Sequence, residues 1–239
     1  MERFVFDQQV GEFYLNSVKE KVIARIEAGN PIRMCLSGPS GTGKSTLARN
    51  IAKTFNLKYV ESSAGLTISP EDRERLMVRY GWTGSGHKEV IRLSQMKPDF
   101  GYEFQTAILS NRIKLIEKES CVVFDRSPLD NLTYFMLQCS SNVPDFMVDE
   151  FIVRCRAAMD KVTHLIIIET PDMSTGYTVE DNNSRISNYY YQAMVNQIFL
   201  HNLNRYLLQT KSNYKTLTIN SWDFKVRTQM LLDFIFNNV

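Results

Sequence analysis

One short glycine-rich segment constrains the fold of this chain most strongly, and it reads Gly38-Pro39-Ser40-Gly41-Thr42-Gly43-Lys44-Ser45-Thr46. It fits the pattern G-x-x-x-x-G-K-[ST] of a phosphate-binding loop, the P-loop. An apolar strand-like stretch at 32–37 precedes it and a helix-like stretch at 44–55 follows it, whereas a chance glycine-rich turn would lack this setting. In such a unit, backbone N–H groups and the helix N-terminus point at an anion. The sequence therefore predicts a strand, loop and helix that bind the phosphates of a nucleotide.

The residue types in this loop each serve phosphate binding. Glycine lets the backbone wrap closely around an anion. Lys44 supplies a positive charge to the outer phosphates, and the Ser45 hydroxyl can ligate Mg²⁺, so we expect ATP and Mg²⁺ as ligands. The residues expected to contact the nucleotide are Gly38, Ser40, Gly41, Thr42, Gly43, Lys44, Ser45 and Thr46.

Strand-like and helix-like segments alternate along the chain. Further apolar runs typical of buried strands lie at 57–60, 121–124, 164–168 and 217–219. Segments with helical character lie at 12–28, 100–118, 128–139, 145–159, 184–210 and 223–237. This alternation predicts an α/β fold of three layers, in which helices flank a five-stranded parallel sheet. Ligands of such sheets bind beyond the carboxyl ends of the strands.

No repeat, low-complexity segment or flexible linker divides the sequence, so we expect residues 1–239 to form a single domain. Within it, we interpret residues 1–30 as an N-terminal helical extension. Residues 62–98 read as an irregular insertion that covers the substrate, with a charged helix-like piece at 70–80. Residues 170–186 read as a lid.

Composition favours a cytoplasmic protein. The formal net charge is +2, which argues neither for nor against a polyanionic partner. No apolar run reaches the ~18 residues of a membrane-spanning helix, and the N-terminus does not read as a signal peptide, so no membrane association is expected. The four cysteines lack C-x-x-C spacing, which favours reduced thiols over a zinc site.

A second cluster of polar residues follows the strand-like run at 121–124. It reads Asp125-Arg126-Ser127-Pro128. A carboxylate at the end of a strand can lie near Mg²⁺, and Arg126 can reach a phosphate or an acceptor group. Ser127 before Pro128 is also typical of a helix N-cap. Both interpretations can hold, with Ser127 as the cap and Asp125 and Arg126 in function.

An amide early in the 100–118 helix is a candidate for base recognition. Gln105 can both donate to and accept from the edge of a nucleobase, and Tyr102 or Phe104 can stack on the base. On this interpretation Gln105, Arg126 and Tyr102 bind the substrate.

Together these segments resemble a known group of enzymes. The P-loop, Phe104-Gln105 in a helix, and Val122-Val123-Phe124-Asp125-Arg126-Ser127 look like the deoxynucleoside kinase and thymidylate kinase group of P-loop kinases. They also look like the nicotinamide riboside kinase-type P-loop proteins, which are often labelled AAA-like ATPases. The resemblance spans residues 32–210.

The resemblance implies roles for single residues. Glu61, at the end of the second strand, matches the carboxylate that takes the proton from the acceptor hydroxyl. Asp125 is the second candidate for this base, or a group that organises Mg²⁺. Gln105 matches the base-reading amide and Arg126 the arginine that steadies acceptor and phosphate. Arg185 matches a lid arginine, which with Lys44 would neutralise charge on the transferred group.

Three functions remain open on the sequence. The first is ATP-dependent phosphoryl transfer to a hydroxyl or phosphate of a nucleoside or nucleotide. The second is a kinase whose acceptor lies in DNA or RNA, suggested by basic residues interleaved with Tyr80 and Trp82 in 62–98. The third is a P-loop ATPase switch. The 145–159 helix either joins the core or forms the face of a homodimer.

Overall fold

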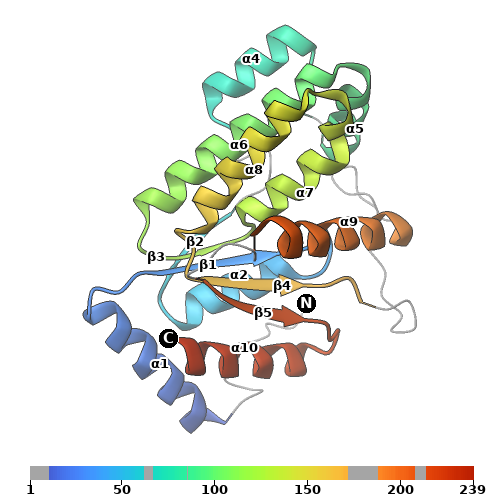
Figure 1. Ribbon diagram of the computed structural model, residues 1–239. Helices are drawn as coiled ribbons and strands as arrows, with labels where there is room; N and C mark the ends of the chain where they lie inside the picture. The colour runs from blue at the N-terminus through green and yellow to red at the C-terminus, as the bar shows by residue number, and fades with distance from the viewer. Residues whose placement is uncertain (1–10, 62–66, 85, 172–187, 208–213) are drawn as a thin grey trace.

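The computed structural model describes residues 11–61, 67–84, 86–171, 188–207 and 214–239. Its centre is a five-stranded sheet in the order β2-β3-β1-β4-β5, and every neighbouring pair is parallel. The predicted α/β fold with a parallel sheet between helical layers is confirmed (Figure 1). The strands are β1 (Ile32–Ser37), β2 (Lys58–Val60), β3 (Cys121–Phe124), β4 (His164–Ile168) and β5 (Lys215–Ile219).

The helices fall close to the expected segments, with two differences. The long helix expected at 184–210 is described as α9 followed by a π-helical turn, Leu203–Leu207, and the rest of that range lies outside the described residues. The segment 62–98, expected to be irregular apart from 70–80, contains a second helix, α5. The helices are α1 (Glu12–Glu27), α2 (Lys44–Thr54), α4 (Pro70–Tyr80), α5 (His87–Met96), α6 (Pro98–Lys118), α7 (Pro128–Gln138), α8 (Asp145–Met159), α9 (Tyr189–Asn202) and α10 (Phe224–Asn238).

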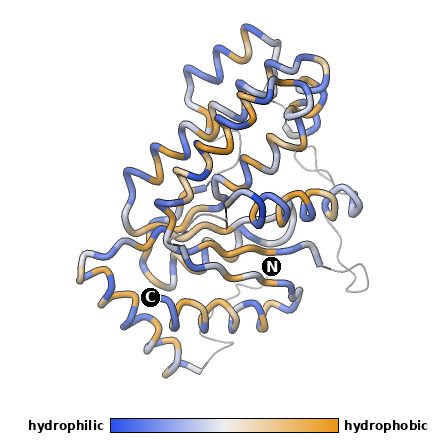
Figure 2. Tube along the Cα trace, viewed as in Figure 1, coloured by the Kyte–Doolittle hydropathy of each residue, from blue (hydrophilic) through white to orange (hydrophobic). Residues whose placement is uncertain are grey.

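Two helical layers cover the sheet because alternate strand residues point to opposite faces. In β1, Met34 and Leu36 pack with α1, α2 and α10, whereas Cys35 packs with α6 to α9 on the other face. The strands β3 and β4 divide in the same way, with Val122 and Val123 on opposite faces. Both faces are therefore apolar, and the central strands carry the hydrophobic colour in Figure 2.

The register brings the carboxyl ends of the central strands together. Cys35 in β1 pairs with Phe124 in β3, and Ser37 pairs with Ile167 in β4. The glycine-rich loop after β1 therefore lies beside the residues that follow β3. This placement joins the first two sequence motifs at one edge of the sheet.

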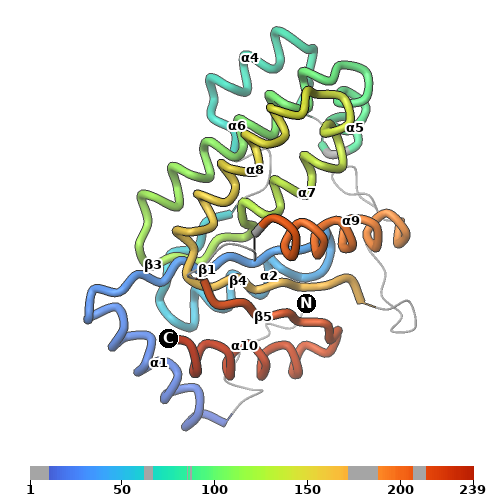
Figure 3. The backbone as a smooth tube through the Cα atoms, viewed as in Figure 1, coloured from blue at the N-terminus to red at the C-terminus, as the bar shows by residue number. Residues whose placement is uncertain are grey.

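Helix α1 lies against α10 (Figure 3). The Tyr14 hydroxyl donates to Asp233 at 2.5 Å, and the Lys21 ammonium donates to the Phe236 carbonyl at 2.9 Å. The described part of the expected N-terminal helical extension is thus packed onto the last helix.

Helices α4, α5 and the first half of α6 form a helical arm beyond the sheet (Figure 1). This arm has its own apolar cluster, in which Tyr80 and Trp82 are buried at 7% and 3% exposure. The Trp82 ring meets Phe104 edge-on, with ring centroids 5.3 Å apart. The aromatic residues expected to interleave with basic ones on a surface are therefore core residues.

Helix α8 contributes to the core through one face only. Phe151 and Cys155 are buried against α6 and α7, whereas Phe146 and Val153 are 69% and 59% exposed. In the described part of the chain, no helix is both long and apolar enough to cross a bilayer.

A buried histidine makes the stability of this fold depend on pH. His164 begins β4, is 1% exposed and lies against Asn238 and Phe234 of α10. Burial lowers the pKa of His164 to about 4 from its ordinary 6.5, although the hydrogen bond to the Asn238 carbonyl opposes this. The folded state therefore favours the neutral ring, so stability is fully present above pH 6.5 and is lost as the pH falls toward 4.

We predict that His164→Gln removes this part of the pH dependence. Denaturant unfolding between pH 7 and pH 4 measures it, and the wild type should lose about 3 kcal/mol more than the variant over that window. Equal losses in the two proteins would contradict the prediction.

Candidate active site

The glycine-rich loop adopts a conformation that requires glycine. Gly38, Gly41 and Gly43 have φ of +132°, +83° and +83°, which is left-handed backbone that other residues rarely adopt. At Gly38 a Cβ would also lie 2.2 Å from the carbonyl oxygen of Ile168 at the end of β4. Gly43 is the N-cap residue of α2, so the loop leads directly into the N-terminus of that helix.

The side chains of the loop are held by its own backbone. Thr42 donates through its hydroxyl to the Pro39 carbonyl at 3.0 Å. The Lys44 ammonium donates to the same carbonyl and to the Thr42 hydroxyl at 3.2 Å, and Lys44 is only 4% exposed. Ser40 and Ser45 are half-buried, whereas Thr46 is exposed. The predicted nucleotide-binding residues thus form one loop and the first turn of α2, and the Lys44 ammonium is bonded to that loop.

Asp125 follows β3 and is 7% exposed. Its N–H donates to the Val60 carbonyl of β2 at 3.0 Å, which extends the sheet pairing to the carboxylate. The Tyr59 hydroxyl donates to Asp125 Oδ2 at 3.4 Å. Burial raises the pKa of Tyr59 to about 12, and the Asp125 carboxylate adds to this. Tyr59 therefore remains a neutral donor to the carboxylate.

Arg126 reaches from the β3 end to the P-loop. Its Nη1 donates to Asp130 at 2.9 Å and its Nη2 to the Ser40 hydroxyl at 3.2 Å. The guanidinium also lies 5.5 Å from the centre of the Tyr134 ring. Burial lowers the pKa of Arg126, but Tyr134, Asp130 and Asp125 outweigh it, so the net pKa is raised. Arg126 therefore lies beside the P-loop, and its contact with a phosphate remains a prediction.

Ser127 is the N-cap of α7, as its position before Pro128 indicates. Its hydroxyl accepts from the Leu129 N–H, while Asp130 accepts from the Ser127 N–H, which completes a capping box. Asp125 and Arg126 lie just outside this cap, so the capping interpretation of Ser127 leaves both residues available for their predicted roles.

Glu61 lies at the end of β2 on a more open surface. Its side chain is 44% exposed and forms an ion pair with Arg49 of α2 at 3.8 Å. The Arg49 guanidinium also lies 5.4 Å from the centre of the Tyr59 ring. A series of contacts therefore connects the two carboxylates considered as bases, running from Glu61 through Arg49 and Tyr59 to Asp125.

Gln105 and Tyr102 lie farther along α6. Gln105 is 3% exposed, and both ends of its amide are bonded: Nε2 donates to Gln138 at 2.9 Å and Oε1 accepts from Asn131 at 3.3 Å. Tyr102 is half-buried and packs edge-on against Phe135. Base reading by Gln105 would have to exchange these internal bonds for bonds to the substrate, and its role remains a prediction. Arg185 lies outside the described residues.

The structure adds residues that carry no sequence motif. Arg227 of α10 donates to the Thr42 carbonyl at 2.8 Å, and its guanidinium lies 4.7 Å from the ring of Trp222. Arg112 of α6 is fully buried and donates to the Ser127 carbonyl at 2.7 Å and to Asn131. Both arginines lie in segments for which the sequence predicts only a helix, and the fold brings them to the loops.

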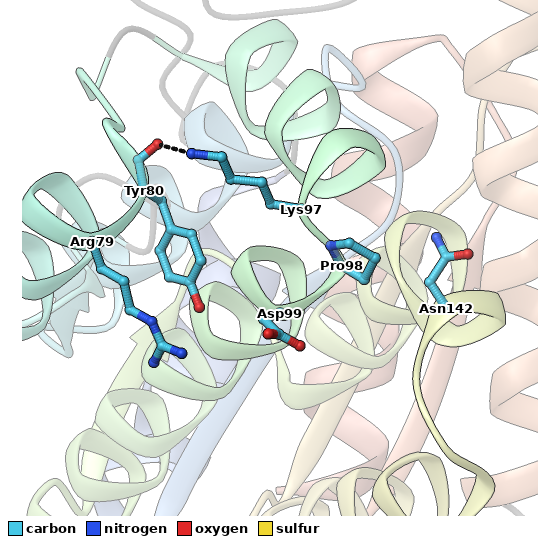
Figure 4. A pocket seen from close by; sticks show the side chains of 6 residues that line it. All are labelled: Arg79, Tyr80, Lys97, Pro98, Asp99 and Asn142. Atoms are coloured by element: carbon cyan, nitrogen blue, oxygen red, sulfur yellow. Dashed lines mark hydrogen bonds between the residues drawn. The ribbon is translucent and has the colours of Figure 1, made fainter.

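A surface hollow lies between the helical arm and Asn142, which follows α7 (Figure 4). Its volume is about 510 Å³. None of the residues predicted for the site lines it, so the chemistry assigned above belongs to the P-loop region. The hollow is lined by Arg79, Tyr80, Lys97, Pro98, Asp99 and Asn142.

The donor set at the strand ends suits Mg²⁺ held partly by phosphates. Among the described residues, no group of three or more histidine, cysteine, aspartate or glutamate side chains could hold a metal ion. Mg²⁺ is commonly held by one or two carboxylates, water and substrate phosphates rather than by a protein cage. The Asp125 carboxylate and the Ser45 hydroxyl fit that pattern.

A family model and a solved structure agree with this fold. A model of the family described as AAA domain matches residues 33–207. A deoxyadenosine kinase from M. mycoides, solved with dCMP and a flexible dCDP, superposes with a TM-score of 0.55 and 13% identity, covering 87% of this chain and all of that one. This likeness shows a kinase-like P-loop fold.

Curated relatives match over a short segment. Lon protease from Lachnoclostridium phytofermentans is 44% identical over 57 residues, which is 21% of this chain and 7% of that protein. Lon protease 1 from Hydrogenovibrio crunogenus is 37% identical over 67 residues, 26% of this chain and 8% of that protein. The chain thus spans less than a tenth of the length of these relatives.

We predict that Gly38→Ala lowers the free energy of unfolding by about 3 kcal/mol or more, because backbone strain adds to the clash with Ile168. Gly29→Ala is the control: Gly29 has φ of +74° but open space around its Cβ position. Its cost should be about 1 kcal/mol, the strain alone. Equal losses in denaturant unfolding would show that contact with β4 does not shape the loop.

Proposed function

The chain belongs to the AAA domain family, and from this premise we propose that it transfers the γ-phosphoryl group of ATP to a nucleoside- or nucleotide-type acceptor. The observation that carries this proposal is the contact between Arg126 and Ser40 of the P-loop, next to the buried carboxylate of Asp125. Transfer of a phosphoryl group needs positive charge beside the group that moves, and this arginine can supply it.

Phosphoryl transfer depends on positioning and on charge stabilisation. In our proposal residues 38–46 bind the ATP phosphates through backbone N–H groups and Lys44. Arg126 and Arg185 add positive charge where it builds up on the transferred group. Ser45 and Asp125 would hold Mg²⁺, which would supply positive charge to offset that of the phosphates.

The two carboxylates suit different tasks. Asp125 is buried beside the P-loop, which favours a role close to the phosphates. Glu61 is more exposed and lies at the neighbouring strand end, where an acceptor hydroxyl could approach it. We propose Glu61 as the base that accepts the proton of that hydroxyl, and Asp125 as the group near Mg²⁺.

The nucleotide base would lie near Trp222, which precedes α10. Trp222 is 38% exposed, and Arg227 connects its ring to the Thr42 carbonyl. An aromatic ring near the loop offers a surface for stacking a base. We propose that Trp222 contributes to binding the adenine.

A small acceptor is favoured over a polynucleotide. Tyr80 and Trp82 are core residues, so they offer no exposed ring for stacking a strand. Arg79 pairs with Glu103 at 2.5 Å and Arg75 with Asp72 at 2.8 Å, which offsets much of the positive charge of α4. The fold shared with a deoxyadenosine kinase that was solved with dCMP and dCDP supports the same choice.

A γ-phosphate transfer assay tests the proposed function. Radiolabelled ATP is offered with free nucleosides, nucleoside monophosphates, or natural and base-modified DNA. Label on a free nucleoside or nucleotide supports the proposal. Label only on DNA, with steep loss of binding at higher salt, would favour the polynucleotide acceptor. Hydrolysis with no labelled acceptor would favour an ATPase switch.

We predict that Lys44→Ala lowers the transfer rate by at least ~10²-fold while the protein stays folded, because the positive charge that offsets the charge of the transferred group is lost. Lys53→Ala, an exposed lysine in the last turn of the same helix, is the matched control and should keep its rate. Rates come from the assay above and folding from circular dichroism. A near-normal rate in Lys44→Ala would exclude this loop as the catalytic site.

We also predict that two measurements distinguish the role of Asp125 from that of Glu61. Asp125→Asn should weaken the enhancement of ATP binding by Mg²⁺, measured by calorimetry with and without the metal, because the carboxylate ligand is lost. Glu61→Gln should leave that enhancement unchanged and lower the transfer rate by about 10²-fold, the loss of a general base. If Glu61→Gln instead weakened the effect of Mg²⁺ and Asp125→Asn left it unchanged, Glu61 would be the group near Mg²⁺ and Asp125 the base.

A further inference from the structure

One buried carboxylate joins the ends of two strands. Asp130 lies in the first turn of α7 and is 2% exposed. Its Oδ1 accepts from Arg126 Nη1 at 2.9 Å and from the Gly38 N–H at 3.4 Å. Its Oδ2 accepts from the Ser127 N–H at 2.9 Å and from the Ser127 hydroxyl at 3.3 Å. One side chain thus contacts the first residue of the P-loop and the turn that follows β3.

A second hydrogen bond joins the end of β1 to the turn that follows β3. The Ser37 hydroxyl, at the end of β1, donates to the Ser127 hydroxyl at 2.6 Å. Arg112 lies beneath and donates to the Ser127 carbonyl at 2.7 Å. The turn of residues 125–127 is therefore fixed to the P-loop and to α6, and Arg126 has little freedom at its backbone.

The backbone of Arg126 shows what this arrangement maintains. Its φ of +139° is costly for a residue with a side chain, and such strain persists only where the surroundings determine it. Capping α7 needs only Ser127 and Asp130, so the cap alone does not explain why Arg126 is strained. The strain has one clear result: the guanidinium points from the β3 end to Ser40.

We propose that Asp130 is a positioning residue that aligns Arg126 on the outermost phosphate of the bound nucleotide, so that the site distinguishes ATP from ADP. The proposal rests on the proposed function, because it assumes that ATP occupies the P-loop. Asp130 itself touches no phosphate. It acts through Arg126, which it holds against Ser40, and through the Gly38 N–H.

The chemistry of Asp130 requires a carboxylate and not merely a polar group. All its partners are donors: two N–H groups, a guanidinium and a hydroxyl. An amide at this position would present its NH₂ group either to Arg126 and Gly38 or to Ser127. Donor would then face donor, and the charge that attracts Arg126 would be lost.

The test compares dissociation constants for ATP and ADP by calorimetry, which needs no acceptor. The variants are Asp130→Asn, Arg126→Met and the double variant. We expect the wild type to prefer ATP and Asp130→Asn to lose roughly tenfold of that preference, the effect of one charge-assisted hydrogen bond. Arg126→Met should lose a similar factor. The double variant should lose no more than either one, because Asp130 acts through Arg126.

The matched control is Asp72→Asn. Asp72 is also a carboxylate in the first turn of a helix, accepts from the Ser69 N-cap hydroxyl at 3.1 Å and pairs with Arg75 at 2.8 Å, but it lies on α4 in the helical arm. Its variant should lose a similar capping contribution and keep the full preference for ATP. This separates alignment of Arg126 from general loss of helix stability.

The outcomes are distinct. An unchanged ATP preference in Asp130→Asn, or losses that multiply in the double variant, overturns the role of Asp130 and leaves the proposed function standing. A wild type that binds neither nucleotide overturns both. If Asp130→Asn does not fold, Arg126→Met carries the test, and an unchanged ATP preference in that variant overturns the proposal.

Discussion

The site depends on the close approach of the P-loop to the end of β4. At Gly38 the chain passes so near the Ile168 carbonyl that no Cβ fits between them. This contact exists because β1 lies between β3 and β4 in a parallel sheet, with the ends of all three strands aligned. The sheet therefore sets the position of the loop. The residues that follow β3 lie beside the loop because β3 and β1 are neighbouring strands.

A layer of buried polar groups then makes this region rigid. Burial lowers the pKa of Arg112 to about 10, while the nearby Asp130 carboxylate opposes the shift. Removing one member of a buried charged group leaves its partner uncompensated, which is far more costly than losing a surface ion pair. One arrangement of the turn at residues 125–127 is therefore stabilised by Arg112, Asp130 and Ser127. The direction of the Arg126 side chain is fixed by this turn.

The sequence could predict whatever depends on local pattern. Apolar runs marked the central strands, since strands covered on both faces lack alternation, and the P-loop marked its own strand and helix. The placement of Asp125 and Arg126 followed from strand ends in a parallel sheet. The contacts of Arg112 and Arg227 could not be predicted, because each joins segments far apart in the chain. The burial of Trp82 was missed for the same reason: its partners lie on α6.

The distribution of charge connects this architecture to the size of the acceptor. The cations that reach the P-loop, Arg126 and Arg227, come from opposite sides of it, so attraction for an anion converges on the loop itself. In α4 the arginines are offset instead by acidic neighbours such as Glu103. A polynucleotide would need cations spread along a path, because each phosphate contact adds to its binding. Two arginines bonded to the P-loop and acidic partners for the arginines of α4 are the arrangement that our proposal of a small phosphate-bearing ligand and acceptor requires.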